Sequence, residues 1–249
     1  MRKYLFLIYI FILFPLASFA APTETLHYVI SYKWGLIHKD TGDATITVTP
    51  VGNRYELKLT GMTRPWADRL FKVRDTLISV VRKDNFMPYQ YTKIAHENGK
   101  YSRDDIHFSY NGNLAKGHSK KFRQKKDGSV KMSEQNLEGN APVYDMLSVF
   151  FYLRNIDYGK LKTGETLNTT LFSGSLVEKL TVKCLGKEKI KLKDKSEREA
   201  WHIIFKFTSG GGKKSSDDID CWISADSSHI PLYVVGSLPL GQVRCYYQP

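Results

Sequence analysis

Cysteine is scarce in this sequence, with three residues in a chain of 249. So few cysteines exclude a disulfide-dense scaffold, and none of them has the C-x-x-C spacing of a zinc knuckle or redox motif. After the first twenty residues there is no apolar run of the roughly 20 residues that a membrane-spanning helix needs. No Pro- or Ser-rich linker divides the chain. Because 42% of the residues are hydrophobic, wholesale disorder is excluded as well.

Motifs of the common enzyme classes are also missing. The chain has no G-x-S-x-G, no H-E-x-x-H and no phosphate loop, and its seven histidines are scattered. We therefore expect no catalytic residue, no metal site and no cofactor, which favours a non-enzymatic protein. A catalytic pair of carboxylates brought together from distant strands stays open as an alternative. Such a pair would make the protein a hydrolase of cell-envelope glycans.

The first twenty residues have the pattern of a secretory signal peptide. Arg2 and Lys3 precede an uncharged apolar run, Tyr4 to Leu16, and small residues follow up to Ala20. The pattern predicts cleavage before Ala21 and a single β-rich domain over residues 21–249. No cysteine near the cut offers a lipid attachment site, so we expect an exported, soluble periplasmic protein without a lipid anchor.

Most of the remaining chain has the two-residue period of half-buried strands. Asn98-Gly99, Asn111-Gly112 and Asp127-Gly128 separate strand-like runs, and such dipeptides tolerate the positive φ of tight hairpins. They predict a four-stranded meander. The pattern as a whole predicts a mainly β fold, in which a large curved antiparallel sheet or open barrel of about a dozen strands wraps around one buried apolar helix, α+β by count.

One segment, residues 143–154, is apolar almost all round and predicts that helix, with Pro142 in its first turn. A shorter helical turn at residues 65–71 is expected to dock on the same concave face. Asp145 either caps nearby backbone amides or holds a ligand headgroup. The expected ligand-binding side chains come from both segments: Tyr144, Asp145, Ser148, Phe151 and Tyr152, with Trp66 and Phe71.

Positive charge gathers in two stretches, residues 116–131 and 183–198. They contribute charges of +6 and +4. Their sum, +10, equals the net charge that remains when Arg2 and Lys3 are removed from the formal +12. A nucleic-acid partner does not suit an exported protein, whereas anionic lipid headgroups, acidic glycans or simple solubility do. The candidate contacts for an anionic partner are Lys120, Lys121, Arg123, Lys125 and Lys126.

The three cysteines allow at most one disulfide. Cys184, Cys221 and Cys245 all lie in strand-like runs. Small buried strand residues are the favoured interpretation, and a Cys221–Cys245 bridge is the alternative.

Two motifs make the chain resemble a family of exported bacterial proteins of unknown function. One runs from Asp145 to Arg154 and is followed by Gly159 and Gly164, and the other runs from Cys221 to Pro231. The resemblance implies a β-rich fold, loosely similar to lipoprotein carriers, in which a curved sheet encloses helices and an apolar cavity. It implies no catalytic residue.

Two functions are compatible with these observations. The first is a monomeric periplasmic carrier that holds a lipid or other amphiphile between sheet and helix, with peripheral contact to a membrane. The alternative is an envelope scaffold whose basic strands bind a partner protein or an acidic polysaccharide. The volume and lining of the largest cavity are the most informative observation, because an open apolar cavity favours the carrier and convergent polar groups favour an enzyme.

Overall fold

A computed structural model describes residues 23–209, 213–214, 216–239 and 241–249. The expected signal peptide lies outside these residues. The elements are β1 (Glu24–Trp34), β2 (Ile37–Val51), β3 (Arg54–Thr63), η1 (Ala67–Arg69), β4 (Val73–Arg82), β5 (Pro88–Glu97), β6 (Lys100–Asn111), β7 (Leu114–Gln124), β8 (Val130–Asn140), β9 (Val143–Tyr144), α1 (Ser148–Arg154), η2 (Tyr158–Lys160), β10 (Thr166–Ser173), β11 (Leu176–Lys191), β12 (Glu197–Ser209), β13 (Lys213–Lys214), β14 (Ile219–Ser224), β15 (Pro231–Leu238) and β16 (Gly241–Gln248).

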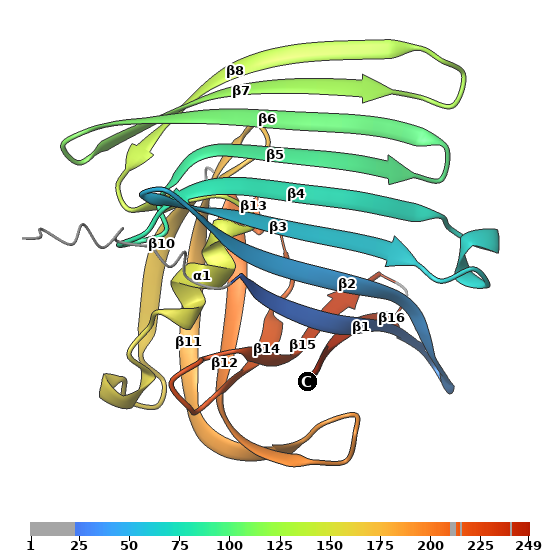
Figure 1. Cartoon of the computed structure of the whole chain (residues 1–249), viewed down its shortest axis with the longest axis vertical. Helices are drawn as coiled ribbons and strands as arrows, with labels where there is room; N and C mark the ends of the chain where they lie inside the picture. Colours follow the sequence, from blue (N-terminus) through green and yellow to red (C-terminus); the bar gives the residue numbers. More distant parts are fainter. Residues whose placement is uncertain (1–22, 210–212, 215, 240) are drawn as a thin grey trace, which may run out of the picture.

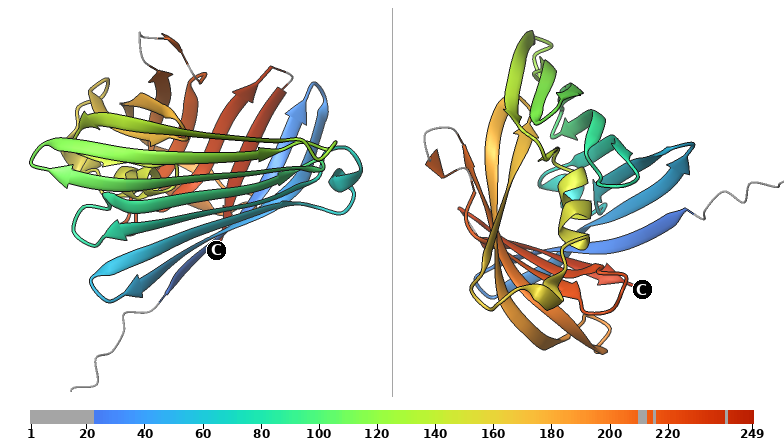
Figure 2. Two further views of the ribbon diagram at one scale, coloured as in Figure 1. Left: turned by 90° about the horizontal axis from the view of Figure 1, so that it is seen from above. Right: turned by 90° about the vertical axis from the view of Figure 1, so that its left-hand side faces the viewer.

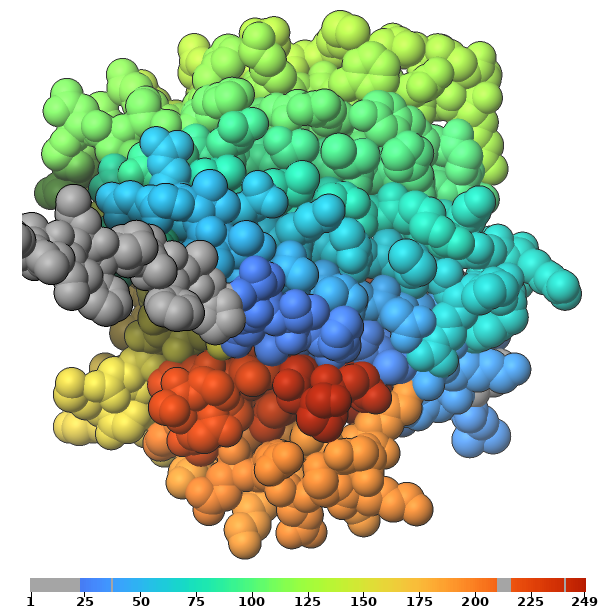
Figure 3. Space-filling model, in the orientation of Figure 1, coloured from blue at the N-terminus to red at the C-terminus, as the bar shows by residue number. Residues whose placement is uncertain are grey.

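All sixteen described strands belong to one sheet that curls into a nearly closed barrel (Figure 1). Its order is β8-β7-β6-β5-β4-β3-β2-β1-β16-β15-β14-β12-β11-β10-β9, and β13 pairs only with β12. Every pair is antiparallel except the short β9–β10 pair. Pairing of β1 with β16 joins the two ends of the described chain, and Figure 3 shows them side by side in blue and red. The predicted antiparallel barrel is thus confirmed.

Alternation along each strand separates the barrel interior from its outer surface. On β1 the inward side chains of Leu26 and Tyr28 are buried, and their cross-strand partners on β2 include Ile46. The predicted meander is confirmed as β5 to β8, connected by hairpins in register. Asn98 and Gly99 both have positive φ, +49° and +81°, as the tight turn between β5 and β6 requires.

One aromatic side chain packs across the gap between the two ends of the sheet. Phe172 on β10 is fully buried and stacks on Phe108, with ring centroids 5.6 Å apart. Its ring also covers Gly117 on β7 and Gly139 on β8, where an added Cβ would lie 2.7 and 3.2 Å from ring carbons. These glycines give the ring room, so the barrel closes by packing where backbone hydrogen bonds stop.

The buried helix is shorter than the sequence predicts. Residues 143–144 form β9, parallel to β10, and α1 begins only at Ser148. Val143 is β-branched and Tyr144 is aromatic, and both residue types favour a strand. The Asp145 carboxylate accepts hydrogen bonds from the N–H groups of Leu147 and Ser148, so the helix starts there. Figure 2 shows α1 at one end of the barrel, between blue-green and orange-red walls. Leu147 and Phe151 pack against strands β1 to β8, whereas Val149 and Leu153 pack against β10 to β14.

The expected docking of residues 65–71 on the concave face is wrong. This loop follows β3 at the barrel end away from α1 (Figure 1), and only one 3₁₀ turn forms in it. Its side chains Trp66, Leu70 and Phe71 are exposed. The reason is local, because Arg64 hydrogen-bonds to Asp43 on β2 and the Trp66 indole N–H donates to the Asp40 carbonyl at 3.1 Å. Trp66 and Phe71 therefore do not join the helix residues in one site.

Candidate functional site

An apolar cavity of about 250 Å³ lies between α1 and a wall formed by β11, β12, β14, β15 and β16. Every lining residue is apolar: Met146, Val149, Phe150, Leu153, Leu180, Phe205, Phe207, Ile219, Val234, Gly236, Val243 and Cys245. Several of these residues are only half-buried, among them Phe207, Val243 and Gly236, so the cavity reaches solvent. At ~30 Å³ for a water-sized group, it holds about eight such groups, which is the size of a medium-length alkyl chain.

Strand register explains why this wall is apolar. Cross-strand neighbours Phe205 and Ile219 pair directly, as do Ile219 and Gly236, so they share the inward face. Gly236 leaves part of the cavity unfilled, because it has no side chain and an added Cβ there would meet no atom within 4 Å. A cavity lined only by hydrocarbon and sulfur offers no hydrogen bond, and it therefore selects for apolar groups.

Asp145 is a structural residue. It is fully buried, its Oδ1 accepts the N–H groups of Leu147 and Ser148 at 2.7 and 2.8 Å, and its Oδ2 accepts the Ser79 hydroxyl at 2.5 Å. In return the Ser148 hydroxyl accepts the Asp145 N–H at 2.9 Å. Burial raises the pKa of Asp145 to about 6, against the opposing effect of these hydrogen bonds. The side chains of Asp145 and Ser148 are thus engaged in hydrogen bonds that start α1. Asp145 therefore caps backbone amides, which is the first of its two predicted roles, and does not hold a ligand headgroup.

Of the five aromatic residues predicted to bind ligand, the three on or just before α1 line grooves other than the apolar cavity. Phe151 stacks on Phe86 and lines a groove of about 370 Å³. Tyr144 and Tyr152 contact each other, with ring centroids 4.9 Å apart, and line a separate groove. None of the three lines the apolar cavity, so the structure divides the predicted ligand residues among different surfaces.

The C-terminal end of α1 is fixed by Arg154. Its guanidinium makes two 2.8 Å hydrogen bonds to the Glu24 carboxylate and donates to the Ser228 carbonyl at 2.9 Å. The His229 ring Nδ1 lies 2.8 Å from the Arg154 carbonyl oxygen. The helix that covers the cavity is thereby held to β1 and to the loop before β15.

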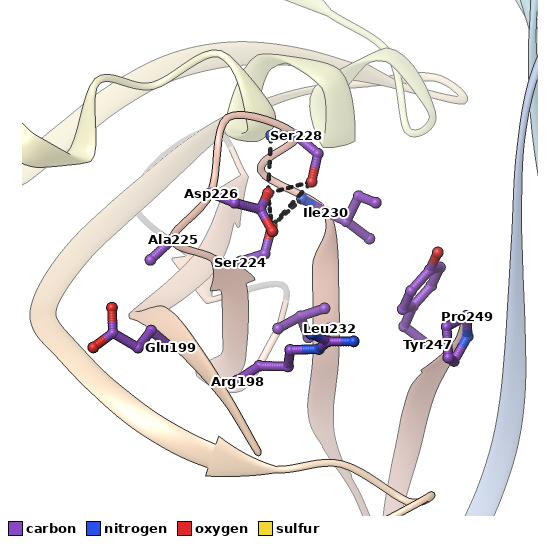
Figure 4. A pocket seen from close by; sticks show the side chains of 10 residues that line it. All are labelled: Arg198, Glu199, Ser224, Ala225, Asp226, Ser228, Ile230, Leu232, Tyr247 and Pro249. Atoms are coloured by element: carbon purple, nitrogen blue, oxygen red, sulfur yellow. Dashed lines mark hydrogen bonds between the residues drawn. The ribbon is translucent and has the colours of Figure 1, made fainter. Parts of the chain in front are cut away.

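That loop belongs to a second, more polar pocket of about 450 Å³ (Figure 4). Asp226 accepts hydrogen bonds from the Ser224 hydroxyl and from the Ser228 N–H and hydroxyl, and these bonds lower its pKa. The Ser224 hydroxyl in turn accepts the Ile230 N–H. The Asp226 carboxylate is thus engaged in shaping the loop, and no nucleophile and base are paired among these labelled residues.

The basic stretch on β7 does not form a single surface. Lys120 points outward and pairs with Glu134 at 3.3 Å, whereas Lys121 and Arg123 alternate onto the inner face. Lys125 and Lys126 are exposed in the turn before β8. Strand alternation, which sequence clustering ignores, separates these five residues.

The cysteines are free. Cys221 and Cys245 both pair with Val234, from β14 and β16. Two inter-strand spacings place their Cα atoms about 10 Å apart, beyond the reach of a disulfide. The favoured interpretation of small buried strand residues is confirmed for Cys184 and Cys221, whereas Cys245 is only half-buried and lines the cavity.

Sequence reasoning missed most of the cavity wall. Phe205, Val234 and Gly236 carry no motif, and alternation within a strand does not say which strands lie beside it. Sequence reasoning also missed that Lys93 points into the barrel, although it lies on the same face of β5 as the buried Tyr91 and Ala95. Among the described residues, no helix has the length and apolarity to cross a membrane.

Comparisons with known proteins agree with this architecture. A family model described as "Protein of unknown function (DUF3108)" matches residues 27–247. A crystal structure of a beta-barrel-like protein of the domain of unknown function DUF1849 from Brucella abortus is similar, with a TM-score of 0.60 and 13% identity over 92% of this chain and 96% of that one. At that identity the likeness concerns the fold alone. No curated protein matches the sequence.

Proposed function

Since this chain belongs to the DUF3108 family of proteins of unknown function, its role has to be inferred from its own geometry, and we propose that it is a non-enzymatic carrier for a lipid or other amphiphile. The observation that carries the proposal is the wholly apolar cavity beneath α1. Each buried methylene contributes ~0.8 kcal/mol, so an alkyl chain gains affinity there without any polar contact.

A series of unbranched alcohols tests the cavity directly. Affinity measured by calorimetry should rise about fourfold for each added methylene, and the gain should stop near eight to ten carbons, when about 250 Å³ is filled. Mass spectrometry of the native protein should show a co-purified amphiphile. No binding of any alcohol would contradict the proposal.

Gly236 offers a specific variant for this test. Gly236→Leu projects a side chain into open space within the cavity, so we expect the protein to fold and to lose most of its alcohol affinity. Ser237→Leu is the matched control, because Ser237 is exposed and points to the opposite face of the same strand. Equal affinity of the two variants would place the bound chain elsewhere.

The proposed site of action is the periplasm. It is supported by the basic and apolar pattern of residues 1–20 and by the small residues before Ala21. Cell fractionation and the N-terminal mass of the purified protein test it. An intact N-terminus in the cytoplasmic fraction would contradict it.

A carrier must also meet the membrane, and we assign this contact to the end of the barrel away from α1. Six large apolar side chains are exposed in the β1–β2 turn, in the β3–β4 loop and at the strand ends beside them: Trp34, Leu36, Met62, Trp66, Leu70 and Phe71. Lys33, Lys39, Arg69 and Lys72 accompany them in the sequence, a combination that suits an anionic bilayer surface. The β3–β4 loop projects from the molecule in teal in Figure 3.

Vesicle co-sedimentation tests this contact. Binding to phosphatidylcholine vesicles should increase when phosphatidylglycerol is included, and Leu70→Ser should weaken it. The control is Val51→Ser, because Val51 is an exposed apolar residue at the end of β2, at the opposite end of the barrel. This variant should bind as the unchanged protein does. Equal loss in both variants would contradict the assignment.

A further inference from the structure

A row of charged side chains crosses the inner face of the barrel opposite the apolar wall. Lys93 on β5 is in register with Asp104 on β6, and Asp104 is in register with Lys121 on β7. Two residues along, Tyr91 and Ile106 are in register and fully buried in the core. Because alternate residues share a face, the row of Lys93, Asp104 and Lys121, here called the charged row, points into the barrel.

The charged row has more positive than negative charge. Arg123, on the same face of β7, forms an ion pair with Asp104. The Lys121 ammonium has only a hydroxyl partner, Ser175 Oγ at 3.3 Å. Within the part of the chain that the structure describes, neither Lys93 nor Lys121 forms an ion pair, so three cations surround one carboxylate.

Two more acids, Asp75 and Glu97, lie close to this row. Asp75 on β4 lies near Lys93, which lowers its pKa, but burial and the adjacent Glu97 raise that pKa more strongly. Neither Asp75 nor Glu97 lines the pocket that contains Lys93, Asp104 and Lys121. The two lysines therefore leave positive charge inside a partly enclosed space.

That space is a pocket of about 390 Å³ that adjoins the apolar cavity. Lys93, Asp104 and Lys121 line it together with the tip of the β10–β11 hairpin, Ser173 to Leu176. Met146, just before α1, lines both this pocket and the apolar cavity. A molecule that passes Met146 would thus have hydrocarbon walls at one end and two ammonium groups at the other.

We propose that the charged row binds the anionic headgroup, a carboxylate or a phosphate, of the amphiphile whose alkyl chain fills the apolar cavity. The inference rests on the carrier function proposed above and narrows its ligand class. Ammonium groups donate charge-assisted hydrogen bonds to such oxygens, which are stronger than neutral ones. Uncharged and cationic amphiphiles of equal chain length lack this interaction.

Four decyl probes separate the contribution of the head from that of the chain: decanoate, decyl phosphate, decanol and decyltrimethylammonium. By calorimetry we expect one or both anions to bind at least tenfold more tightly than decanol, which corresponds to ~1.4 kcal/mol, and the cation to bind least. Which anion binds more tightly identifies the headgroup as a carboxylate or a phosphate.

Lysine variants then locate the interaction. The double variant Lys93→Met/Lys121→Met keeps the aliphatic stems, so decanol should bind unchanged while the preference for anions is lost. Lys93→Glu/Lys121→Glu should instead favour decyltrimethylammonium. Lys120→Met is the control, because Lys120 is adjacent in sequence but outside the barrel, and it should retain the preference.

The outcomes distinguish this inference from the carrier function. If decanol binds as tightly as the anions, or if Lys120→Met abolishes the preference as completely as the double variant, the charged row is not the headgroup site and the carrier function stands. If no decyl probe binds, the carrier function itself is refuted. Unchanged decanol affinity in the double variant shows that it has folded.

Discussion

Closure of the barrel by Phe172 leads to a quantitative prediction about Gly117. In Gly117→Ala the new Cβ would lie 2.7 and 3.0 Å from Cδ2 and Cε2 of Phe172, whereas carbon atoms pack best at ~3.5–4.0 Å. The ring would have to retreat by roughly 0.8–1 Å, yet Phe108 stacks on it from another side. Overpacking of this kind destabilises by ~1–3 kcal/mol.

A double-mutant cycle shows whether the ring is the cause. Phe172→Ala removes a fully buried ring and should cost ~3–5 kcal/mol. In that background the clash is gone, so Gly117→Ala should be neutral or stabilise by up to ~1 kcal/mol. We therefore expect a coupling energy of about 2 kcal/mol from urea unfolding followed by circular dichroism.

The control for this cycle is Gly61→Ala on β3. The nearest side-chain atom to a Cβ there is Leu59 Cδ2 at 4.0 Å, so the variant should be neutral or slightly stabilising. If Gly117→Ala had the same effect with and without Phe172, within ~0.5 kcal/mol, the packing argument would fail. If Phe172→Ala does not fold, Phe172→Leu takes its place with a smaller but still non-zero coupling.

Three further predictions concern Asp145, Arg154 and the cysteines. Burial raises the folded-state pKa of Asp145 to about 6 from 3.8. The free energy of unfolding should therefore fall, relative to that of Asp145→Asn, by at most ~3 kcal/mol as pH rises from 4 to 6. If urea unfolding gave the same difference between the two proteins at every pH, this reasoning would be contradicted. Glu24→Gln removes the carboxylate from a largely buried Arg154 and should cost ~1–3 kcal/mol, detectable as a lower melting temperature; an unchanged melting temperature would show that the pair is not formed. Alkylation after denaturation without reductant should modify three thiols, since Cys221 and Cys245 are separated by a strand; a mass two hydrogens lower would reveal a bridge.

Local patterns were sufficient to predict much of the fold. Period-two alternation and the Asn-Gly and Asp-Gly dipeptides placed β5 to β8 close to their observed bounds, because both depend on a few adjacent residues. The apolar segment before Arg154 indicated a helix buried on several sides, and α1 indeed packs its two faces on the two halves of the barrel. The helix begins later than predicted, since pairing of residues 143–144 with β10 is a long-range contact.

The sequence by itself determined the strands, their turns and the apolar helix, because side-chain alternation and turn chemistry are local properties of the chain. Only the tertiary structure decided which side chains meet. In the folded chain Asp145 starts the helix, and Trp66 and Phe71 lie at the end of the barrel away from α1. Lys121 points into the barrel, whereas its neighbour Lys120 points outward. The cavity arises in the same way, since β11, β12, β14, β15 and β16 contribute one or two residues each, and their register depends on the closure of the whole sheet.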